Sequence, residues 1–390
     1  MDLLKLLTDY DANGSFADMA KNVNTMDGSG YAWYVRITDL ENPKPLSELK
    51  YVDKLSYEFL KKTELHGGEL LMAKRGDIGK VYIFEPRTKY ATVAPNMYLL
   101  KLNNKVIPHF LYDYFVSDEG NKKLARLNAS STMGALYKDD VKNIDVIMPS
   151  IEEQSKIGIY FQSLDHLITL HQRKCDEVKS LKKYMLQKMF PQNEQKVPEI
   201  RFEGFTEAWE QRKLGELYQR NTERNENLIG YDKTISVATM SYKDDGNGAS
   251  ESSLSTYKVI RVGDIAFEGH TNKQFRFGRF VVNDIGTGII SPRFSTLRPL
   301  NEMPVNFWKQ YIHSESVMRR ILVNSTKAGT MMNELVIPEF LNQTIMVPSE
   351  NEQAIIGQYF TNLDHLITLH QQKCEELKKI KKFMLQKMFV

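Results

Sequence analysis

The chain contains one long segment twice, and this repeat constrains its fold more than any other feature. Residues 149–190 read PSIEEQSKIGIYFQSLDHLITLHQRKCDEVKSLKKYMLQKMF, and residues 348–389 read PSENEQAIIGQYFTNLDHLITLHQQKCEELKKIKKFMLQKMF. The copies agree at roughly two-thirds of their positions without a gap, whereas the sequences before them look mostly unlike each other. Each copy is therefore expected to bind the same kind of partner. The dissimilar regions are expected to present two different recognition surfaces on one duplicated frame.

Apolar residues in both copies recur at alternating steps of four and three, which is the heptad spacing of a coiled coil. No glycine or proline interrupts the pattern after Gly158 and Gly357, and the Pro-Ser pairs at Pro149 and Pro348 are suitable helix starts. We predict two long helices that pack against each other through matching faces. The predicted contact positions, called seam residues below, are Ile157, Phe161, Leu164, Ile168, His171, Cys175, Val178, Lys182, Met185 and Met189 in the first helix, and Ile356, Phe360, Leu363, Ile367, His370, Cys374, Leu377, Lys381, Met384 and Met388 in the second.

Chain connectivity sets the expected direction of packing. Residues 191–347 leave the end of the first helix and lead to the start of the second. If this segment is globular, its ends lie close together, and the two helices are then antiparallel. About 33 residues at about 1.5 Å per residue give each helix a length of about 50 Å. The expected molecule is pseudo-twofold, with one head at each end of the helix pair.

Four seam residues are polar where apolar side chains would pack better. They are His171, His370, Lys182 and Lys381. Polar seam residues select register and partner in coiled coils, and this interpretation is preferred to a catalytic role. A metal site made of His166 and His171 is excluded, because residues five apart point to different faces of a helix.

Cys175 and Cys374 are the two cysteines of the chain, and they hold the same position in the two repeats. This arrangement argues against a disulfide framework and against a four-ligand zinc site. We interpret both as small buried apolar residues.

The composition is typical of a multidomain protein without a membrane segment. With 390 residues and 42% hydrophobic content, the chain can bury two or more cores of ordinary domain size. No apolar run approaches the roughly 18 to 20 residues that span a bilayer, and the opening MDLLKLLTDYD lacks the features of a signal peptide. The expected location is the cytoplasm, and no membrane partner is expected.

The pattern of repeats and linkers divides the chain into five segments. They are a first head at 1–148, a helical region at 149–190, a polar linker at 191–200, a second head at 201–347 and a second helical region at 348–390. Strand-like runs such as KVYIF and RFVV alternate with helical stretches in both heads. The predicted fold class is α+β, with two mixed α/β heads separated by an antiparallel coiled coil. Weak similarity between ATVAPNMYLLK and GIISPRFSTLR indicates that the duplication covers whole halves.

Basic residues are concentrated at about the same place in both halves, although the net charge is only +3. Bases outnumber acids in residues 74–89 and again in residues 258–298. Ordinary solvated surface is the alternative for either stretch alone. The occurrence of such a stretch in both halves favours contact with phosphate groups.

The segment 270–280, HTNKQFRFGRF, mixes bases, amides and aromatic residues in a way that suits phosphate anchoring, base-edge hydrogen bonds and stacking. The alternative is a strand that buries Phe275, Phe277 and Phe280. In the first half, AKRGDIGKVY does not have the spacing of a phosphate-binding loop and predicts a tight turn that displays basic side chains. The candidate DNA-binding residues are Lys74, Arg75, Lys80 and Lys89 in the first head, and His270, Asn272, Lys273, Gln274, Arg276, Arg279 and Arg293 in the second.

Motifs of catalysis are missing from the sequence. It contains no nucleotide-binding loop, no dinucleotide-binding glycine fingerprint, no His-Glu zinc helix and no Gly-x-Ser-x-Gly elbow. The chain is therefore expected to be a binding subunit whose partners carry out any chemistry. One alternative is a scaffold whose heads bind proteins. Another is a single-chain nuclease, which metal-dependent cleavage by the purified chain would support.

The alternation of two variable heads with two near-identical helical regions resembles the specificity subunit of type I restriction-modification systems. The resemblance rests on PSIEEQ or PSENEQ at the start and MLQKMF at the end of each helical region, and it covers essentially the whole chain. The stretch 207–217, EAWEQRKLGEL, also resembles the usual opening of a target recognition domain in that family. The first head departs from this pattern, because the sequence starts near DLLKLL without a tryptophan-containing stretch. A short first recognition domain is therefore expected.

The resemblance implies a non-catalytic subunit that reads double-stranded DNA. It implies assembly with two methyltransferase subunits, which use S-adenosylmethionine, and with restriction subunits that use ATP and magnesium, so that no cofactor is expected in this chain. The helical regions would be equivalent docking sites, and the two recognition domains would read unlike parts of a bipartite target. The family has no short DNA-contact motif that could be transferred to this chain, so the candidate residues were chosen from local chemistry alone. Arg276 and Arg279 are expected to contact the second half-site. A helix pair of about 50 Å spans about 14 base pairs at roughly 3.4 Å each, which predicts half-sites about one helical turn apart.

Overall fold

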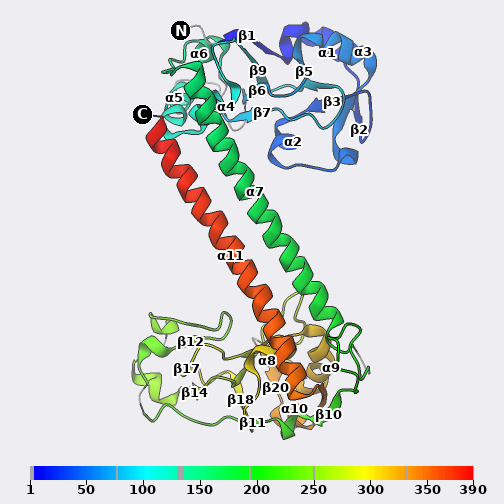
Figure 1. Cartoon of the computed structure of the whole chain (residues 1–390), viewed down its shortest axis with the longest axis vertical. Helices are drawn as coiled ribbons and strands as arrows, with labels where there is room; N and C mark the ends of the chain where they lie inside the picture. Colours follow the sequence, from blue (N-terminus) through cyan, green and yellow to red (C-terminus); the bar gives the residue numbers. More distant parts are fainter. Residues whose placement is uncertain are drawn as a thin grey trace. The chain divides into compact units, whose positions relative to one another are not determined.

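The protein is represented by a computed structural model that divides the chain into two compact units. Unit 1 comprises residues 1–171 and 372–390, and unit 2 comprises residues 172–371. The structure describes residues 4–75, 78–129, 136–192, 195–227, 229–248, 251–330 and 332–389. Each unit therefore combines one head with part of each repeated segment (Figure 1).

The head of unit 1 contains two sheets. The first is antiparallel with the order β1-β9-β6-β7, and the second has the order β2-β4-β3-β8-β5 with one parallel pair, β3 and β8. The strands of the first sheet are β1 (Leu4–Asp9), β6 (Leu70–Ala73), β7 (Val81–Ile83) and β9 (Met97–Leu102). Those of the second are β2 (Thr25–Asp27), β3 (Ala32–Val35), β4 (Lys50–Val52), β5 (Glu64–Leu65) and β8 (Ala91–Val93).

Short α-helices complete the described part of this head. They are α1 (Phe16–Asn22), α2 (Ile37–Glu41), α3 (Lys54–Phe59), α4 (Pro108–Val116), α5 (Asp118–Ala129) and α6 (Lys138–Lys142). Helix α1 begins with a capping box, in which Ser15 and Asp18 satisfy each other's backbone N–H groups. Helix α4 carries Phe110 and Tyr114 into the core that the first sheet shares with the long helices.

The head of unit 2 has a four-stranded antiparallel sheet with the order β11-β18-β15-β16. Its strands are β11 (Tyr218–Arg220), β15 (Ile265–Glu268), β16 (Arg279–Val282) and β18 (Ser295–Pro299). Two-stranded pairs are β10 (Glu210–Lys213) with β21 (Thr344–Val347), β12 (Ile235–Ser236) with β13 (Ser241–Tyr242), β14 (Lys258–Ile260) with β17 (Gly288–Ile290), and β19 (Thr326–Lys327) with β20 (Glu334–Leu335). The helices are α8 (Val305–Tyr311), α9 (Glu315–Ser325) and α10 (Ile337–Asn342).

The two four-stranded sheets have the same topology. In each, the first strand pairs with the fourth, the fourth with the second, and the second with the third. This shared order confirms that the duplication extends into the heads and that each head is mixed α/β. The heads differ at the ribbon of β10 and β21, which follows Trp209, because residues 143–150 at the corresponding end of the first head form no strand.

The repeated segments form α7 (Ile151–Lys188) and α11 (Glu350–Met388), of 38 and 39 residues. They are longer than the 33 residues assumed from the sequence, because the helices begin directly after the Pro-Ser pairs and continue nearly to the end of each repeat. Ser150 and Ser349 cap the starts, since their hydroxyls accept the N–H groups of Glu153 and Glu352.

The helices run antiparallel in both units. In unit 1, Lys381 Nζ lies 2.6 Å from Asp165 Oδ1, and Cys374 Sγ donates to the carbonyl of Ile168 at 3.5 Å. The residue number thus falls along α11 as it rises along α7. In unit 2, the corresponding pair is Lys182 with Asp364, also at 2.6 Å. These contacts and the mixed heads confirm the fold class expected from the sequence.

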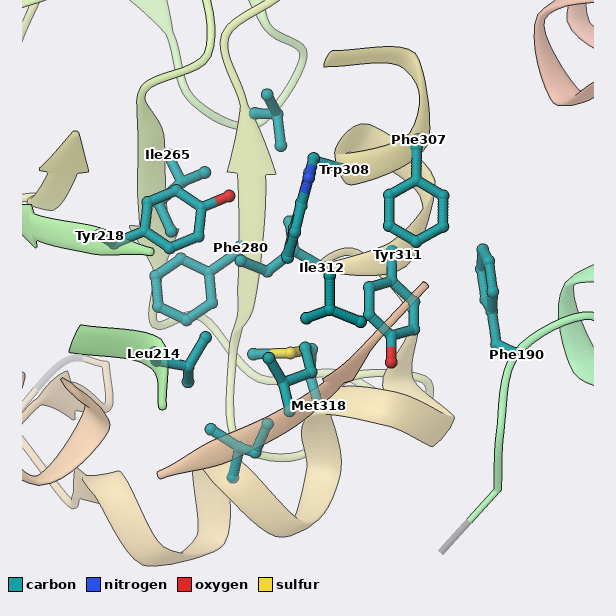
Figure 2. Close-up of a cluster of buried hydrophobic side chains, with 14 of the residues drawn as sticks. Phe190, Leu214, Tyr218, Ile265, Phe280, Phe307, Trp308, Tyr311, Ile312 and Met318 are labelled. Atoms are coloured by element: carbon teal, nitrogen blue, oxygen red, sulfur yellow. The ribbon is translucent and has the colours of Figure 1, made fainter. Parts of the chain in front are cut away.

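The last aromatic residue of each repeat packs into the core beside the start of the other repeat. In unit 2, Phe190 lies against Tyr311, with ring centroids 4.9 Å apart, and near Phe307 (Figure 2). The Phe360 ring centroid lies 5.8 Å from that of Phe190. In unit 1, the equivalent Phe389 contacts three aromatic partners of matching type, which are Phe110, Tyr114 and Phe161. The head of each unit is thereby fixed to a helix from each repeat.

Candidate nucleic-acid interface

One end of the four-stranded sheet brings together the basic segments of the second head. Arg220 at the end of β11 pairs with Leu297 of β18, and Phe267 near the end of β15 pairs with Ser295 at the start of β18. The hairpin loop 269–278, which joins β15 to β16, therefore lies at the same end of the sheet as the end of β11. We call this the loop end of the sheet.

The same topology places Lys74, Arg75 and residues 78–80 of unit 1 at the loop end of the first sheet, because they lie between β6 and β7. The two basic stretches noticed in the sequence therefore contain equivalent hairpin loops. Gly76 and Asp77, which belong to the predicted turn, lie outside the described residues.

The hairpin loop of unit 2 is held in shape by its own side chains. Asn272 Oδ1 accepts the N–H groups of Gln274 and Phe275 at 2.8 and 2.9 Å. Phe275 is buried, and its ring centroid lies 5.0 Å from that of His313. The polar residues around this anchor are exposed, namely His270, Asn272, Lys273, Gln274 and Arg276. The alternative interpretation is right about the aromatic residues, since Phe275 and Phe280 are buried and Phe277 is half-buried. The polar residues face solvent, and their contact with DNA stays a prediction.

Gly269 marks a close approach of a second loop to this hairpin. A Cβ atom at Gly269 would lie 1.9 Å from the carbonyl oxygen of Asn333, whose N–H donates to the Gly269 carbonyl at 3.0 Å. Only glycine allows the two backbones to come so close. The segment around Asn333 is thereby fixed beside the hairpin.

Arg279 lies at the base of the hairpin, with its charge balanced. Its Nε lies 2.6 Å from Glu268 Oε2, and its Nη2 donates to the carbonyl of Ala238 at 3.0 Å. This half-buried pair joins the two strands at the loop end. Arg279 is thus engaged within the head, whereas Arg276 is exposed.

In unit 1, two of the four candidate bases are also paired. Lys74 Nζ lies 3.0 Å from Asp9 Oδ2 and 2.7 Å from Asp11 Oδ2, and Lys80 Nζ lies 2.5 Å from Glu41 Oε1. Burial alone would raise the pKa of Asp9, but its hydrogen bonds from lysines hold that pKa below the usual value. The carboxylates in these pairs balance the positive charges of Lys74 and Lys80, which are therefore less available to an anionic ligand.

The other two bases of unit 1, Arg75 and Lys89, are exposed. Lys89 Nζ lies over the ring of Tyr90 at 5.2 Å, and Tyr90 in turn stacks on Tyr31 with centroids 4.7 Å apart. In unit 2, the remaining candidate Arg293 is exposed between β17 and β18. The fold thus places the sequence candidates in four separate places, which are the two hairpins, the segment before β8 that carries Lys89, and the turn that carries Arg293.

The structure places all the seam residues at buried or half-buried positions. Lys182 and Lys381, which were interpreted as register-selecting residues, each pair with an aspartate of the opposite helix. Both cysteines are buried and donate to carbonyls of the facing helix.

A second feature of the helices was not predicted from the sequence. At four repeat positions, both copies have an apolar or aromatic side chain that immediately precedes a seam residue and is 40% to 55% exposed. We call these the flank residues; they are Leu167, Leu170, Ile380 and Phe383 in unit 1, and Leu181, Tyr184, Leu366 and Leu369 in unit 2. They occupy equivalent repeat positions, so comparing the two copies could have revealed them.

The described residues give no sign of a metal centre or a membrane span. Within them, no group of three or more His, Cys, Asp or Glu side chains is placed to hold a metal ion. No helix in the described part of the chain is long and apolar enough to cross a bilayer.

Comparisons with known proteins agree with this architecture. The curated "Putative type I restriction enzyme MjaX specificity subunit" of Methanocaldococcus jannaschii is 26% identical over 171 residues, which are 42% of this chain and 40% of that protein. The alignment thus spans well under half of that relative.

Solved structures add a similarity of fold. The type I restriction-modification S subunit from M. genitalium superposes with a TM-score of 0.53 and 13% identity, covering 99% of this chain and 96% of that one. The HsdS subunit from Thermoanaerobacter tengcongensis has a TM-score of 0.48 and 16% identity, with coverage of 99% and 94%.

The sequence profile of one family matches both halves. The type I restriction modification DNA specificity domain matches residues 18–180 and again residues 206–379, so each match combines a head with most of the helix that follows it. The two matches together cover most of the chain, and the protein therefore belongs to the type I restriction modification DNA specificity family, of which it carries two domain copies.

Proposed function

We propose that this chain is the DNA-specificity subunit of a type I restriction-modification complex. The observation that carries the proposal is the repetition of one sheet topology with differently composed hairpin loops at equivalent ends. Loops on a shared scaffold determine what each copy binds. Two heads that share a sheet topology but carry different loops suit a DNA target made of two unlike half-sites.

The exposed loop residues support a reading role for the second head. Lys273 and Arg276 can anchor phosphates, while the amides of Asn272 and Gln274 can hydrogen-bond base edges. In the first head, the exposed Lys89 lies over Tyr90, which stacks on Tyr31. Different chemistry at equivalent loops would select different half-sites.

The flank residues support docking of partner subunits on the helices. In an antiparallel pair related by a local twofold, residues that precede the seam in either helix lie on the same side. Each unit therefore presents four such side chains as one apolar face, repeated in the other unit. Two equivalent faces suit two copies of a methyltransferase subunit, and exposed apolar groups of this kind mark interaction sites.

Catalysis and its cofactors are assigned to the partners. S-adenosylmethionine would be used by the methyltransferase subunits, and ATP with magnesium by the restriction subunits. This chain would read DNA without catalysing a reaction, and the complex would act in the cytoplasm, where genomic DNA is accessible.

The docking face of unit 2 can be tested with the double variant L366E/L369E. Introducing two carboxylates into an apolar contact should remove one of two methyltransferase copies, because each buried leucine contributes roughly 1.5–3 kcal/mol. Native mass spectrometry of the co-expressed complex would show the loss of one copy. The control H365E/Q372E adds the same charge at exposed positions away from the seam. Equal stoichiometry in both variants would contradict the proposed face.

The reading function can be tested by co-expressing this chain with its methyltransferase subunit and mapping adenine methylation across the host genome. We expect a new asymmetric motif made of two half-sites with a fixed spacer. Replacing Gln274 by alanine should relax one half-site by about 1–3 kcal/mol through the loss of one bidentate contact. Asn272 is kept in this variant, because its Oδ1 holds the loop in shape. A stable complex that methylates nothing would favour a protein-binding scaffold.

A further inference from the structure

Four bases of unit 2 form a cluster that the sequence does not place together. Arg220 ends β11, and Arg224 forms an isolated β-bridge with Lys258 at the start of β14. Lys258 Nζ donates to the carbonyl of Phe294 at 2.6 Å, and the Arg293 guanidinium lies over the Phe294 ring at 4.7 Å. We call Arg220, Arg224, Lys258 and Arg293 the basic patch.

The basic patch lacks carboxylate partners. None of its four residues forms an ion pair with a carboxylate among the described residues, and Arg220, Arg224 and Arg293 are exposed. Two arginines near the patch do have carboxylate partners. Arg261 pairs with Glu223 at 2.6 Å, and Arg298 pairs with both Glu223 and Asp264 at 2.6 and 2.8 Å.

The charges of the patch act on one another. The pKa of Lys258 is lowered, first by burial and then by the positive charges of Arg220 and Arg224. Like charges held together by the backbone are unfavourable, and an anion would relieve them. The β-bridge and the hydrogen bond to Phe294 fix Lys258 in place, so the patch is already assembled before a ligand binds.

The geometry points to a ligand that carries several phosphates. We propose that the basic patch binds consecutive backbone phosphates of a DNA duplex, beside the hairpin loop at the loop end of the same sheet. Arg293 precedes Ser295, which pairs with Phe267 at that end, and the chain runs toward the same end from Arg220, which is level with Ile265. One duplex could therefore meet both the patch and the exposed loop residues. This inference rests on the proposed function and adds the contacts that would position the second head without reading bases.

The test is the salt dependence of binding to a fluorescein-labelled duplex of arbitrary sequence, about 30 base pairs long, enough for a specific protein–DNA interface. Fluorescence anisotropy with the full chain in its methyltransferase complex would give the slope of log K against log salt. The variant R220A/R224A should lower that slope by about 1.8, or about 0.9 per lost phosphate contact, and weaken binding roughly tenfold per contact at 0.1 M salt. The methylated motif should stay the same, because phosphate contacts carry no sequence information.

Two control variants make the result specific. R220K/R224K keeps the charge and should retain the slope, whereas K213A removes an exposed charge from β10 outside the patch and should change nothing. An unchanged slope for R220A/R224A, in protein with unaltered circular dichroism and melting temperature, would overturn the patch. If the wild-type complex methylates a bipartite motif in that case, the proposed function stands; if it binds no DNA, the proposed function fails with the patch.

A second arm distinguishes DNA from a free anion. Inorganic phosphate is added in place of chloride at matched ionic strength, and the melting temperature of wild type and R220A/R224A is compared. Stabilisation of the wild type by phosphate alone, together with an unchanged DNA slope in the variant, would identify a single-anion site and reject the duplex.

Discussion

Phe161→Ala is expected to lower the free energy of unfolding of unit 1 by about 3–5 kcal/mol, since truncating a fully buried phenylalanine removes apolar contacts and leaves a cavity. The Phe161 side chain is 0% exposed, and its ring stacks on Phe389 with centroids 6.0 Å apart. Phe360 holds the same place in unit 2, where it is also 0% exposed and lies 5.8 Å from Phe190. Phe360→Ala should therefore cost unit 2 about the same amount.

Hydrogen exchange resolved by mass spectrometry can separate the two effects. Phe161→Ala should speed exchange in the first head and Phe360→Ala in the second, because each aromatic cluster holds one head to the helices. Ile159→Ala is the matched control on α7; its side chain is 60% exposed, so a change within about 0.5 kcal/mol is expected. Equal effects of Phe161→Ala on both heads would contradict two separately anchored cores.

Asp113→Asn is expected to remove a strong pH dependence from the stability of unit 1. Asp113 is 2% exposed on α4, and burial raises its pKa from 3.8 to about 8. The positive charge of Lys381 on α11 opposes this rise, and the negative charge of Asp165 on α7 adds to it. The equivalent residue of α8 is Gln310, whose Nε2 donates to Asp364 at 3.1 Å. The second head thus has an uncharged amide where the first has a carboxyl group.

The direction of this pH dependence follows from the protonation of Asp113 in the folded and the unfolded state. Between about pH 4 and pH 8, the carboxyl group of Asp113 is protonated in the folded state and ionised in the unfolded state. Its contribution to the free energy of unfolding is therefore complete below pH 3.8 and is lost as the pH rises through about 8. The wild type should lose up to about 1.4 kcal/mol per pH unit across this window. Asp113→Asn should be insensitive there, and more stable than wild type at pH 8.

Thermal unfolding from pH 5 to pH 8 measures this difference, and hydrogen exchange assigns it to the first head. Gln310→Glu is the reciprocal variant, which should give the second head the pH dependence that it lacks, since it places a carboxyl beside Asp364. Parallel pH profiles of wild type and Asp113→Asn would show that Asp113 titrates normally.

Much of the frame could be predicted from the repeated segment. Heptad spacing is local, because one helical turn relates each seam residue to the next, so the buried face of α7 and α11 can be read along the chain. The antiparallel direction followed from connectivity. The sequence did not reveal the flank residues beside the seam, because residues such as Leu366 and Phe383 look like ordinary members of an apolar helix until their exposure is known.

The candidate DNA interface could be predicted only in part. The sequence located the hairpin of the second head through its mixture of bases, amides and aromatic residues. It could not show that Lys74, Lys80 and Arg279 have acidic partners, because two of these pairs join residues more than 38 positions apart. Nor could it gather Arg220 and Arg224 with Lys258, because the strands that hold them together are distant in the chain.

The sequence by itself determined the duplicated helices, the family and the alternation of heads and helical regions, since all of these depend on periodicity and repetition along the chain. Only the tertiary structure decided which charges are balanced and which remain available to a ligand. That difference is physical: helix periodicity is set by neighbouring residues, whereas ion pairs and sheet ends are set by strands that meet only when the chain folds.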